Sequence, residues 1–208
     1  MEMNAAAIWI NDTFRMFDEE IATMVHRLYH LAGDFFTPFF EGVSLFGGMG
    51  GAFLILLSVL LALYKPTRRL GTSMCLGLAI GALITNVLLK ILIARQRPYI
   101  DQASVFYQYW LLVEQHTESD KSFPSGHVTA AFASMTPVII LGKPIYKVLA
   151  LCFAVLMMIS RVYLMVHFPS DVLAGMVVGI FAGCMGVLIA SKLPYKWYDW
   201  ELKSKKAA

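Results

Sequence analysis

Long apolar runs recur along this chain, and they restrict what it can fold into more than any other feature. The clear runs cover residues 39–64, 70–94, 128–141, 148–159 with a few residues beyond, and 172–190. A helix needs about 20 mainly apolar residues to cross a bilayer. Only 15% of the residues are charged, whereas soluble globular domains carry roughly one quarter. The sequence therefore predicts an all-α fold, a polytopic membrane bundle of helices.

The whole chain, residues 1–208, is predicted to form a single integral-membrane domain with three parts. Residues 1–38 are an amphipathic or first-helix region, residues 39–191 are the helical core, and residues 192–208 are a basic tail. Within the first part, residues 14–31 place apolar side chains three and four positions apart, but they also carry many charges. This segment either lies in the membrane interface or packs as an irregular first helix, and the sequence leaves both possibilities open.

The distribution of basic residues predicts the orientation in the membrane. Lys and Arg gather in the turn 65–69, in the turn 143–147 and in the tail. These three places fall on one side of the membrane if the apolar runs alternate in direction, and the positive-inside rule puts that side in the cytoplasm. The C-terminus is then cytoplasmic, and the remaining polar stretches gather on the extracytoplasmic face.

Three polar stretches are expected to meet on that face. Lys90 and Arg97 lie near the end of one apolar run, two helical turns apart, so on a continuous helix they would share a face. Residues 124–127, Pro-Ser-Gly-His, open the next run. Residues 160–171 join the last two runs and contain a cation, an imidazole and a carboxylate. Such groups are costly at a membrane, which makes them a functional-site hypothesis.

The residue types in these stretches predict phosphate chemistry. Guanidinium and ammonium groups bind phosphate oxygens, and so do backbone amides at a helix N-terminus. We expect phosphate to be bound by Lys90, Arg97, Ser125, Gly126 and Arg161.

Two histidines can divide the catalytic work on such a phosphate. His167 is the candidate nucleophile with Asp171 as its partner, and His127 is the candidate general acid. The stretches hold no carboxylate cluster suited to Mg²⁺, so we expect neither a metal nor a cofactor.

The ordered set of motifs resembles a known family. Lys90-x6-Arg97-Pro98, then Pro124–His127, then Ser160-Arg161-x5-His167-x3-Asp171 are similar to the three-part signature of the type II phosphatidic acid phosphatase superfamily. The resemblance covers residues 70 to about 190. It implies a bundle of about six transmembrane helices with an extracytoplasmic site, and it assigns the same phosphate-binding and catalytic roles to these residues.

The resemblance implies a lipid phosphate as the substrate and the membrane bilayer as the environment. Phosphatidylglycerol phosphate is the first expectation, because the small chain is similar to bacterial phosphatidylglycerophosphatase B. Undecaprenyl pyrophosphate is second and phosphatidic acid third. The small net charge of +3 does not indicate nucleic acid, and the oligomeric state is left open. Rival classes are an anion transporter, a catalytically silent membrane protein and a vanadate-dependent peroxidase.

Other features have simpler interpretations. Gly47, Gly48, Gly50 and Gly51 are expected to allow close helix packing rather than to bind phosphate. The three cysteines are expected to be small buried residues, and His26 and His30 are not expected to bind a metal. The aromatic-rich segment 99–110 is expected to lie at the membrane interface and to contribute to substrate selection beside the site.

Overall fold

The computed structural model describes residues 4–47, 51–113 and 115–194, and these residues form helices and turns without any strand. The longer helices are α1 (Ala5–Ala32), α2 (Thr37–Gly47), α3 (Ala52–Leu63), α4 (Arg68–Ala82), α7 (Gly126–Leu141), α8 (Pro144–Tyr163) and α9 (Pro169–Lys192). Short helices are α5 (Lys90–Ile93) and α6 (Val105–Leu112), and a π-helical segment, Leu83–Leu89, joins α4 to α5. The all-α prediction is confirmed.

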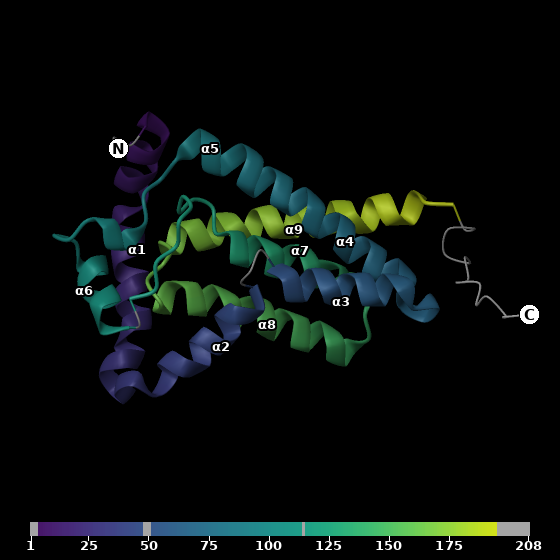
Figure 1. The fold of residues 1–208 in the computed structure, drawn as a ribbon, viewed down its shortest axis with the longest axis horizontal. Coiled ribbons are helices and arrows are strands. Elements are labelled where there is room, and N and C mark those ends of the chain that lie inside the picture. The colour runs from purple at the N-terminus through teal and green to yellow at the C-terminus, as the bar shows by residue number, and fades with distance from the viewer. Residues whose placement is uncertain (1–3, 48–50, 114, 195–208) are drawn as a thin grey trace, which may run out of the picture.

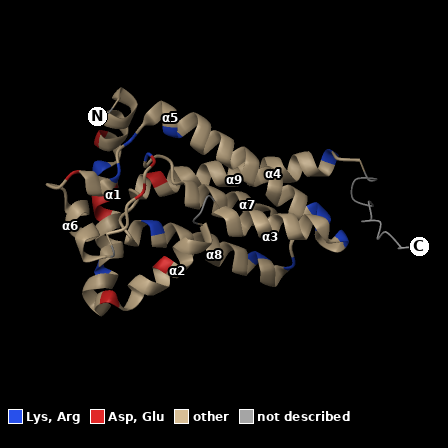
Figure 2. Cartoon of the chain, in the orientation of Figure 1, with Lys and Arg blue, Asp and Glu red and all other residues tan. Residues whose placement is uncertain are grey.

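The helices form a bundle with one end closed by α1. Helices α3, α4, α7, α8 and α9 run side by side along the long axis, while α1 crosses the end of the bundle near α6 (Figure 1). At the opposite end, where α3 meets α4, α7 meets α8 and α9 ends, the coloured charges are Lys and Arg, whereas the acidic residues lie towards α1 and α6 (Figure 2). The basic turns of the sequence therefore lie together at one end of the bundle (Figure 2).

Three helical stretches among the described residues are long and apolar enough to cross a membrane, namely Lys65–Ile100, Pro144–Tyr163 and Pro169–Lys192. A fourth candidate is the pair formed by Ala5–Gly47 and Ala52–Leu63, which is bent by 52°. Helix α7, with 16 residues, is shorter than a typical span. The predicted span over 39–64 is not one straight helix, because α2 ends at Gly47 and Gly51 has the left-handed φ of +77° before α3 begins.

Small residues bring α9 close to α7 and α4. A Cβ atom built on Gly179 would lie 2.6 Å from the Cβ of Phe132, and one on Gly186 would lie 2.3 Å from the carbonyl oxygen of Ser73. A Cβ atom built on Gly175 would lie 2.7 Å from the carbonyl oxygen of Ser125. Backbones in contact at this range are typical of membrane helices, and this contact fixes where α7 begins.

Some smaller expectations can now be compared with the structure. Helix α1 begins at Ala5, earlier than expected; it packs against α8 and α9 but also lies across the end of the bundle (Figure 1), so both interpretations of this segment stay open. Close packing holds for Gly47, whose added Cβ would lie 2.9 Å from Met157, while Gly48 and Gly50 lie outside the described residues. Most of the basic tail also lies outside them. Buried cysteines were a wrong expectation, since Cys152 and Cys184 are exposed on the apolar exterior.

Candidate active site

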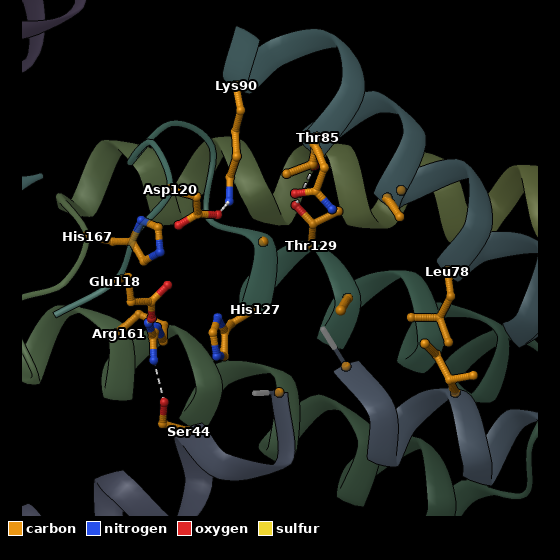
Figure 3. Close-up of a pocket in the computed structure, with 18 of the residues that line it drawn as sticks. Ser44, Leu78, Thr85, Lys90, Glu118, Asp120, His127, Thr129, Arg161 and His167 are labelled. Carbon is orange, nitrogen blue, oxygen red and sulfur yellow. Dashed lines mark hydrogen bonds and ion pairs between the residues drawn. The ribbon is translucent and has the colours of Figure 1, made fainter. Parts of the chain in front are cut away.

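A cavity of about 1070 Å³ opens beside the start of α7. The predicted site residues in its wall are Lys90, Gly126, His127, Arg161 and His167. Figure 3 shows the two histidines and Arg161 pointing into the same space from α7, from α8 and from the α8–α9 connection. Three polar stretches that are far apart in the sequence therefore meet at one place, as the sequence analysis expected.

Two carboxylates of the segment before α7 pair with the three predicted cations, Lys90, Arg97 and Arg161. Glu118 accepts hydrogen bonds from Arg161 Nη2 and, at 3.0 Å, from Arg97 Nη2. Asp120 forms ion pairs with Lys90 and with Arg97. Each carboxylate bridges two cations, as the oxygens of a bound phosphate would. The sequence analysis did not identify Glu118 or Asp120.

The charges of this cluster shift the pKa values of both carboxyl groups. Burial alone would raise the pKa of Glu118, but the positive charges of Arg161 and Arg97 outweigh it and lower the pKa to about 2. Burial also opposes ionisation of Asp120, and hydrogen bonding and charge from Lys90 lower its pKa. Both groups are therefore carboxylates at neutral pH, and they neutralise much of the positive charge.

Lys90 and Arg97 reach the cluster in a different way from the one expected. Helix α5 ends at Ile93, and Ala94 adopts a left-handed conformation with φ of +52°. Arg97 has an extended backbone before Pro98, as residues that precede proline prefer. The expectation of a shared helix face is wrong, and the two side chains instead meet at Asp120 from a helix and from a loop.

His167 is buried between Arg97 and Asp171. Arg97 Nη1 lies 2.9 Å from His167 Nε2. A guanidinium only donates, so Nε2 accepts and the ring proton of the neutral imidazole lies on Nδ1. Burial, with the charges of Arg97 and Arg161, lowers the pKa of His167 well below its ordinary value and keeps the ring neutral. The Nε2 lone pair therefore faces the cation cluster.

Asp171 lies on the Nδ1 side of the same ring. Its Oδ2 atom is 3.7 Å from His167 Nδ1, which is longer than a hydrogen bond. The hydroxyl of Ser122 lies beside both groups, donating to Asp171 Oδ2 at 2.5 Å and lying 3.5 Å from Nδ1. Asp171 Oδ2 also accepts from the backbone N–H of Phe168 at the start of α9. The carboxylate is thus held by the helix terminus and turned towards the ring.

Two predicted phosphate-binding groups have no hydrogen-bond partner among the described residues. These are the Oγ atom of Ser125 and the Nε atom of Arg161, both buried. Buried polar atoms are nearly always paired, so both atoms could pair with a polar ligand; Arg161 lines the cavity, whereas Ser125 is not among its lining residues. Gly126 faces Lys90, and a Cβ added to it would lie 3.5 Å from Nζ.

The structure adds residues that sequence reasoning missed. Ser122 bridges the histidine and the carboxylate, and Arg95 forms an ion pair with Asp171 at 2.6 Å. Arg95 stands only two residues before Arg97, and a second arginine beside a motif cation was an available signal. The aromatic segment 99–110 does not line the cavity, whereas residues 116–120 do. The contribution of 99–110 to substrate selection beside the site stays a prediction.

A helical membrane bundle whose end carries a cluster of three cations and two histidines defines a class of phosphate-handling membrane enzymes. The family model described as the PAP2 superfamily matches residues 70–195, and the chain belongs to this family.

Relatives with known names agree with this assignment. The chain is 30% identical over 147 residues to an undecaprenyl-diphosphatase of Sulfolobus acidocaldarius, covering 71% of this chain and 68% of the relative. It is 33% identical over 145 residues to a decaprenylphosphoryl-5-phosphoribose phosphatase of Mycobacterium tuberculosis, covering 70% and 75%.

A solved structure is similar over nearly the whole chain. The transmembrane PAP2 type phosphatidylglycerolphosphate phosphatase from Bacillus subtilis is 27% identical, with a TM-score of 0.68, covering 91% of this chain and 92% of that one. Aquifex aeolicus LpxE shares the fold, with a TM-score of 0.64 over 80% and 94% of the two chains at 24% identity. The protein is a multi-pass membrane protein and a lipid phosphatase of the PAP2 superfamily.

Proposed function

We propose that this phosphatase hydrolyses a lipid phosphomonoester without a metal, through a phospho-histidine on His167, and that phosphatidylglycerol phosphate is its first substrate. The observation that carries the phosphate site is the pairing of Lys90, Arg97 and Arg161 with two carboxylates, beside two unpaired buried donors. A phosphate group that takes the place of Glu118 and Asp120 satisfies all of these donors.

Substrate binding begins with that exchange. The phosphate oxygens accept from the three cations, from the hydroxyl of Ser125 and from the amides at the start of α7, where the helix dipole favours an anion. Arg97 then turns from His167 Nε2 to the phosphate, which frees the lone pair for attack. Fixed cations of this kind stabilise the charged transition state, and such electrostatic stabilisation usually contributes more to catalysis than any other effect.

The first chemical step transfers the phosphoryl group to the enzyme. His167 Nε2 forms a bond to phosphorus while the bond from phosphorus to the lipid oxygen breaks. His127, which takes up a proton as the anionic phosphate binds beside it, donates that proton to the departing oxygen. Asp171, through Ser122 and directly as the site tightens, stabilises the positive charge that develops on His167.

The second step releases the product. His127, now neutral, accepts a proton from water, and the water oxygen bonds to phosphorus as the bond from phosphorus to His167 breaks. Inorganic phosphate leaves, and both histidines return to their starting protonation states.

The shape of the cavity supports a lipid substrate. Apolar side chains of α2, α3 and α4 continue its wall away from the cations, including Leu45, Ile55, Val59 and Leu78. An acyl or polyprenyl chain can lie there while the phosphate lies on the cluster. The name of the Bacillus subtilis relative favours phosphatidylglycerol phosphate, and that of the Sulfolobus acidocaldarius relative favours undecaprenyl pyrophosphate as the second candidate.

The orientation in the membrane is part of the same proposal. The end of the bundle where the charged residues that the structure describes are Lys and Arg (Figure 2) is assigned to the cytoplasm by the positive-inside rule. The cation cluster lies towards the other end and faces the extracytoplasmic side.

The test is phosphate release from phosphatidylglycerol phosphate, undecaprenyl pyrophosphate and phosphatidic acid by purified protein in detergent with EDTA. Wild-type protein should release phosphate, with the fastest rate on phosphatidylglycerol phosphate, and His167→Ala should not. Activity that is lost in EDTA and restored by a divalent cation contradicts the metal-free mechanism. Full activity of His167→Ala contradicts the assigned nucleophile.

A further inference from the structure

A second polar cluster lies behind the histidine, on the side away from the cavity. Its charged members are Arg95, Asp18 of α1 and Asp171 of α9, and each is at most 1% exposed. Ser170 belongs to the same cluster and is also buried. Buried charges are costly unless they are paired and hydrogen-bonded. The cluster therefore persists because its members satisfy one another, and the phosphate-binding set does not include Arg95 or Asp18.

All three nitrogens of the Arg95 guanidinium donate hydrogen bonds. Its Nη1 donates to Asp171 Oδ1 at 2.6 Å and to the hydroxyl of Ser170 at 2.8 Å. Its Nη2 donates to Asp18 Oδ2 at 2.9 Å, and its Nε donates to Asn11 Oδ1 at 2.7 Å. The ring of Phe168 covers the flat side, 3.8 Å from the central carbon. The planar group thus has a single orientation, which only arginine can adopt.

This arrangement divides the two oxygens of Asp171 between two tasks. Arg95 holds Oδ1, whereas Oδ2 accepts from Ser122 and from the Phe168 amide and faces His167 Nδ1. With Oδ1 fixed, the carboxylate cannot rotate away from the imidazole. Arg95 itself touches neither the cavity wall nor the reacting atoms.

Asp18 fixes the other side of Arg95 and the first turn of α9 together. Its Oδ1 accepts from the backbone N–H of Ser170 at 2.7 Å, and its Oδ2 accepts from the Ser170 hydroxyl at 2.8 Å. A carboxylate at a helix N-terminus satisfies an otherwise unpaired amide and complements the helix dipole. Here the carboxylate comes from a different helix, α1, and it holds the turn that carries Asp171.

We propose that Arg95 and Asp18 are positioning residues for catalysis: Arg95 orients the Asp171 carboxylate towards His167, and Asp18 holds both Arg95 and the N-terminus of α9. This inference rests on the proposed roles of His167 and Asp171. It assigns a task to the polar residues of α1, which bring the N-terminal helix into the catalytic apparatus without contacting the substrate.

The main test uses the double variant Asp18→Asn/Arg95→Gln. Removing the pair together leaves the net charge of the cluster unchanged, with Asp171 as its remaining charged member, so the fold has a better chance of persisting than with Arg95→Gln alone. We expect kcat to fall roughly 10- to 100-fold, because a small displacement of a catalytic group has that effect. KM and the inhibition constant of inorganic phosphate should not change, because the phosphate-binding residues are untouched. An unchanged kcat, or a loss confined to KM, overturns the proposal.

Two further variants cover the case in which the double variant does not fold. Arg95→Lys keeps a charge near Asp171 but reaches fewer acceptors, so its kcat should lie between those of Arg95→Gln and wild type. The matched control is Glu19→Gln, which changes the residue next to Asp18 and breaks an exposed pair with Arg15; it should retain wild-type kcat. Equal losses in Arg95→Lys and Glu19→Gln overturn the proposal.

A double-mutant cycle separates positioning from general damage. If Arg95 acts through Asp171, then Arg95→Gln should lower kcat in the wild-type background but little further in an Asp171→Asn background. The same factor in both backgrounds means that Arg95 acts through the fold, which contradicts the proposal. Measuring His167→Ala alongside separates a failure of the proposed function from a failure of the positioning role. Activity in that variant refutes the proposed function itself, whereas its inactivity beside a fully active Arg95→Gln refutes only the positioning role.

Discussion

Replacing Glu118 by Gln should make the enzyme bind phosphate more tightly. Glu118 bridges Arg161 and Arg97 where the proposed function places the substrate phosphate. An incoming phosphate must therefore break two charge-assisted hydrogen bonds before it can form its own. Glutamine has the same shape and can still accept from one arginine, but it carries no charge to compete.

The structure gives the size of the effect. The pKa of Glu118 is lowered from 4.5 to about 2, which corresponds to roughly 3 kcal/mol of favourable interaction between the carboxylate and its surroundings. The side chain is only 15% exposed, so solvent screens this interaction little. If a glutamine at this position keeps about half of this interaction energy, the free energy with which the side chain competes against phosphate falls by about 1.4 kcal/mol. This corresponds to a factor of about ten in the equilibrium constant for phosphate binding.

The assay is competitive inhibition of lipid hydrolysis by inorganic phosphate at neutral pH. Glu118→Gln should lower the inhibition constant about tenfold, and KM should move in the same direction. The matched control is Asp101→Asn, which removes an acidic residue of the same polar region that pairs only within its own turn in the described structure. A weaker inhibition by phosphate in Glu118→Gln, with the control unchanged, would refute the reasoning, because Glu118 would then support the phosphate site.

Three other predictions concern stability, helix packing and catalysis. Because the folded-state pKa of Glu118 is depressed, its contribution to stability is complete above pH 4.5 and is lost as the pH falls through about 2. In Glu118→Gln the Tm of the protein should depend less on pH across this range. The same pH dependence as in the wild type would contradict this. Gly175→Ala places a methyl group 2.7 Å from a backbone oxygen and should cost about 1–3 kcal/mol of stability, whereas Gly42→Ala meets nothing within 4 Å and should be neutral in the same thermal assay. Ser122→Ala removes the hydroxyl that lies beside both the histidine and its carboxylate, so kcat should fall about tenfold with KM unchanged. A change in KM alone would contradict this role of Ser122.

The sequence was sufficient for the fold class and for most of the cation cluster. Charged side chains at the ends of apolar runs are conspicuous because hydrocarbon excludes them, and this is why Lys90, Arg97 and Arg161 were predicted together. The helix boundaries around them were harder. The left-handed residue Ala94 ends α5 before Arg97. An alanine side chain does not favour that conformation, so the sequence did not predict it.

The carboxylates could not be predicted for a different reason. Several acidic residues stand between α6 and α7 in sequence, and their spacing does not tell which ones fold back onto the cations. Asp18 and Arg95 are 77 residues apart, and only the packing of α1 across the end of the bundle brings them together. Periodicity describes one helix at a time, so contacts between distant helices lie beyond it.

The bridge from Asp18 to the start of α9 also bears on the order of events during synthesis. Asp18 emerges from the ribosome early, but its partner Ser170 follows 152 residues later. At about 5–20 residues per second, the carboxylate waits roughly 8–30 s for that amide. Throughout this interval the Asp18 carboxylate lacks its partner on α9, even after Arg95 has been made, so the contact of α1 with α9 is among the last to form. Helix α1 is thus made well before the α9 contact that holds it in place can form.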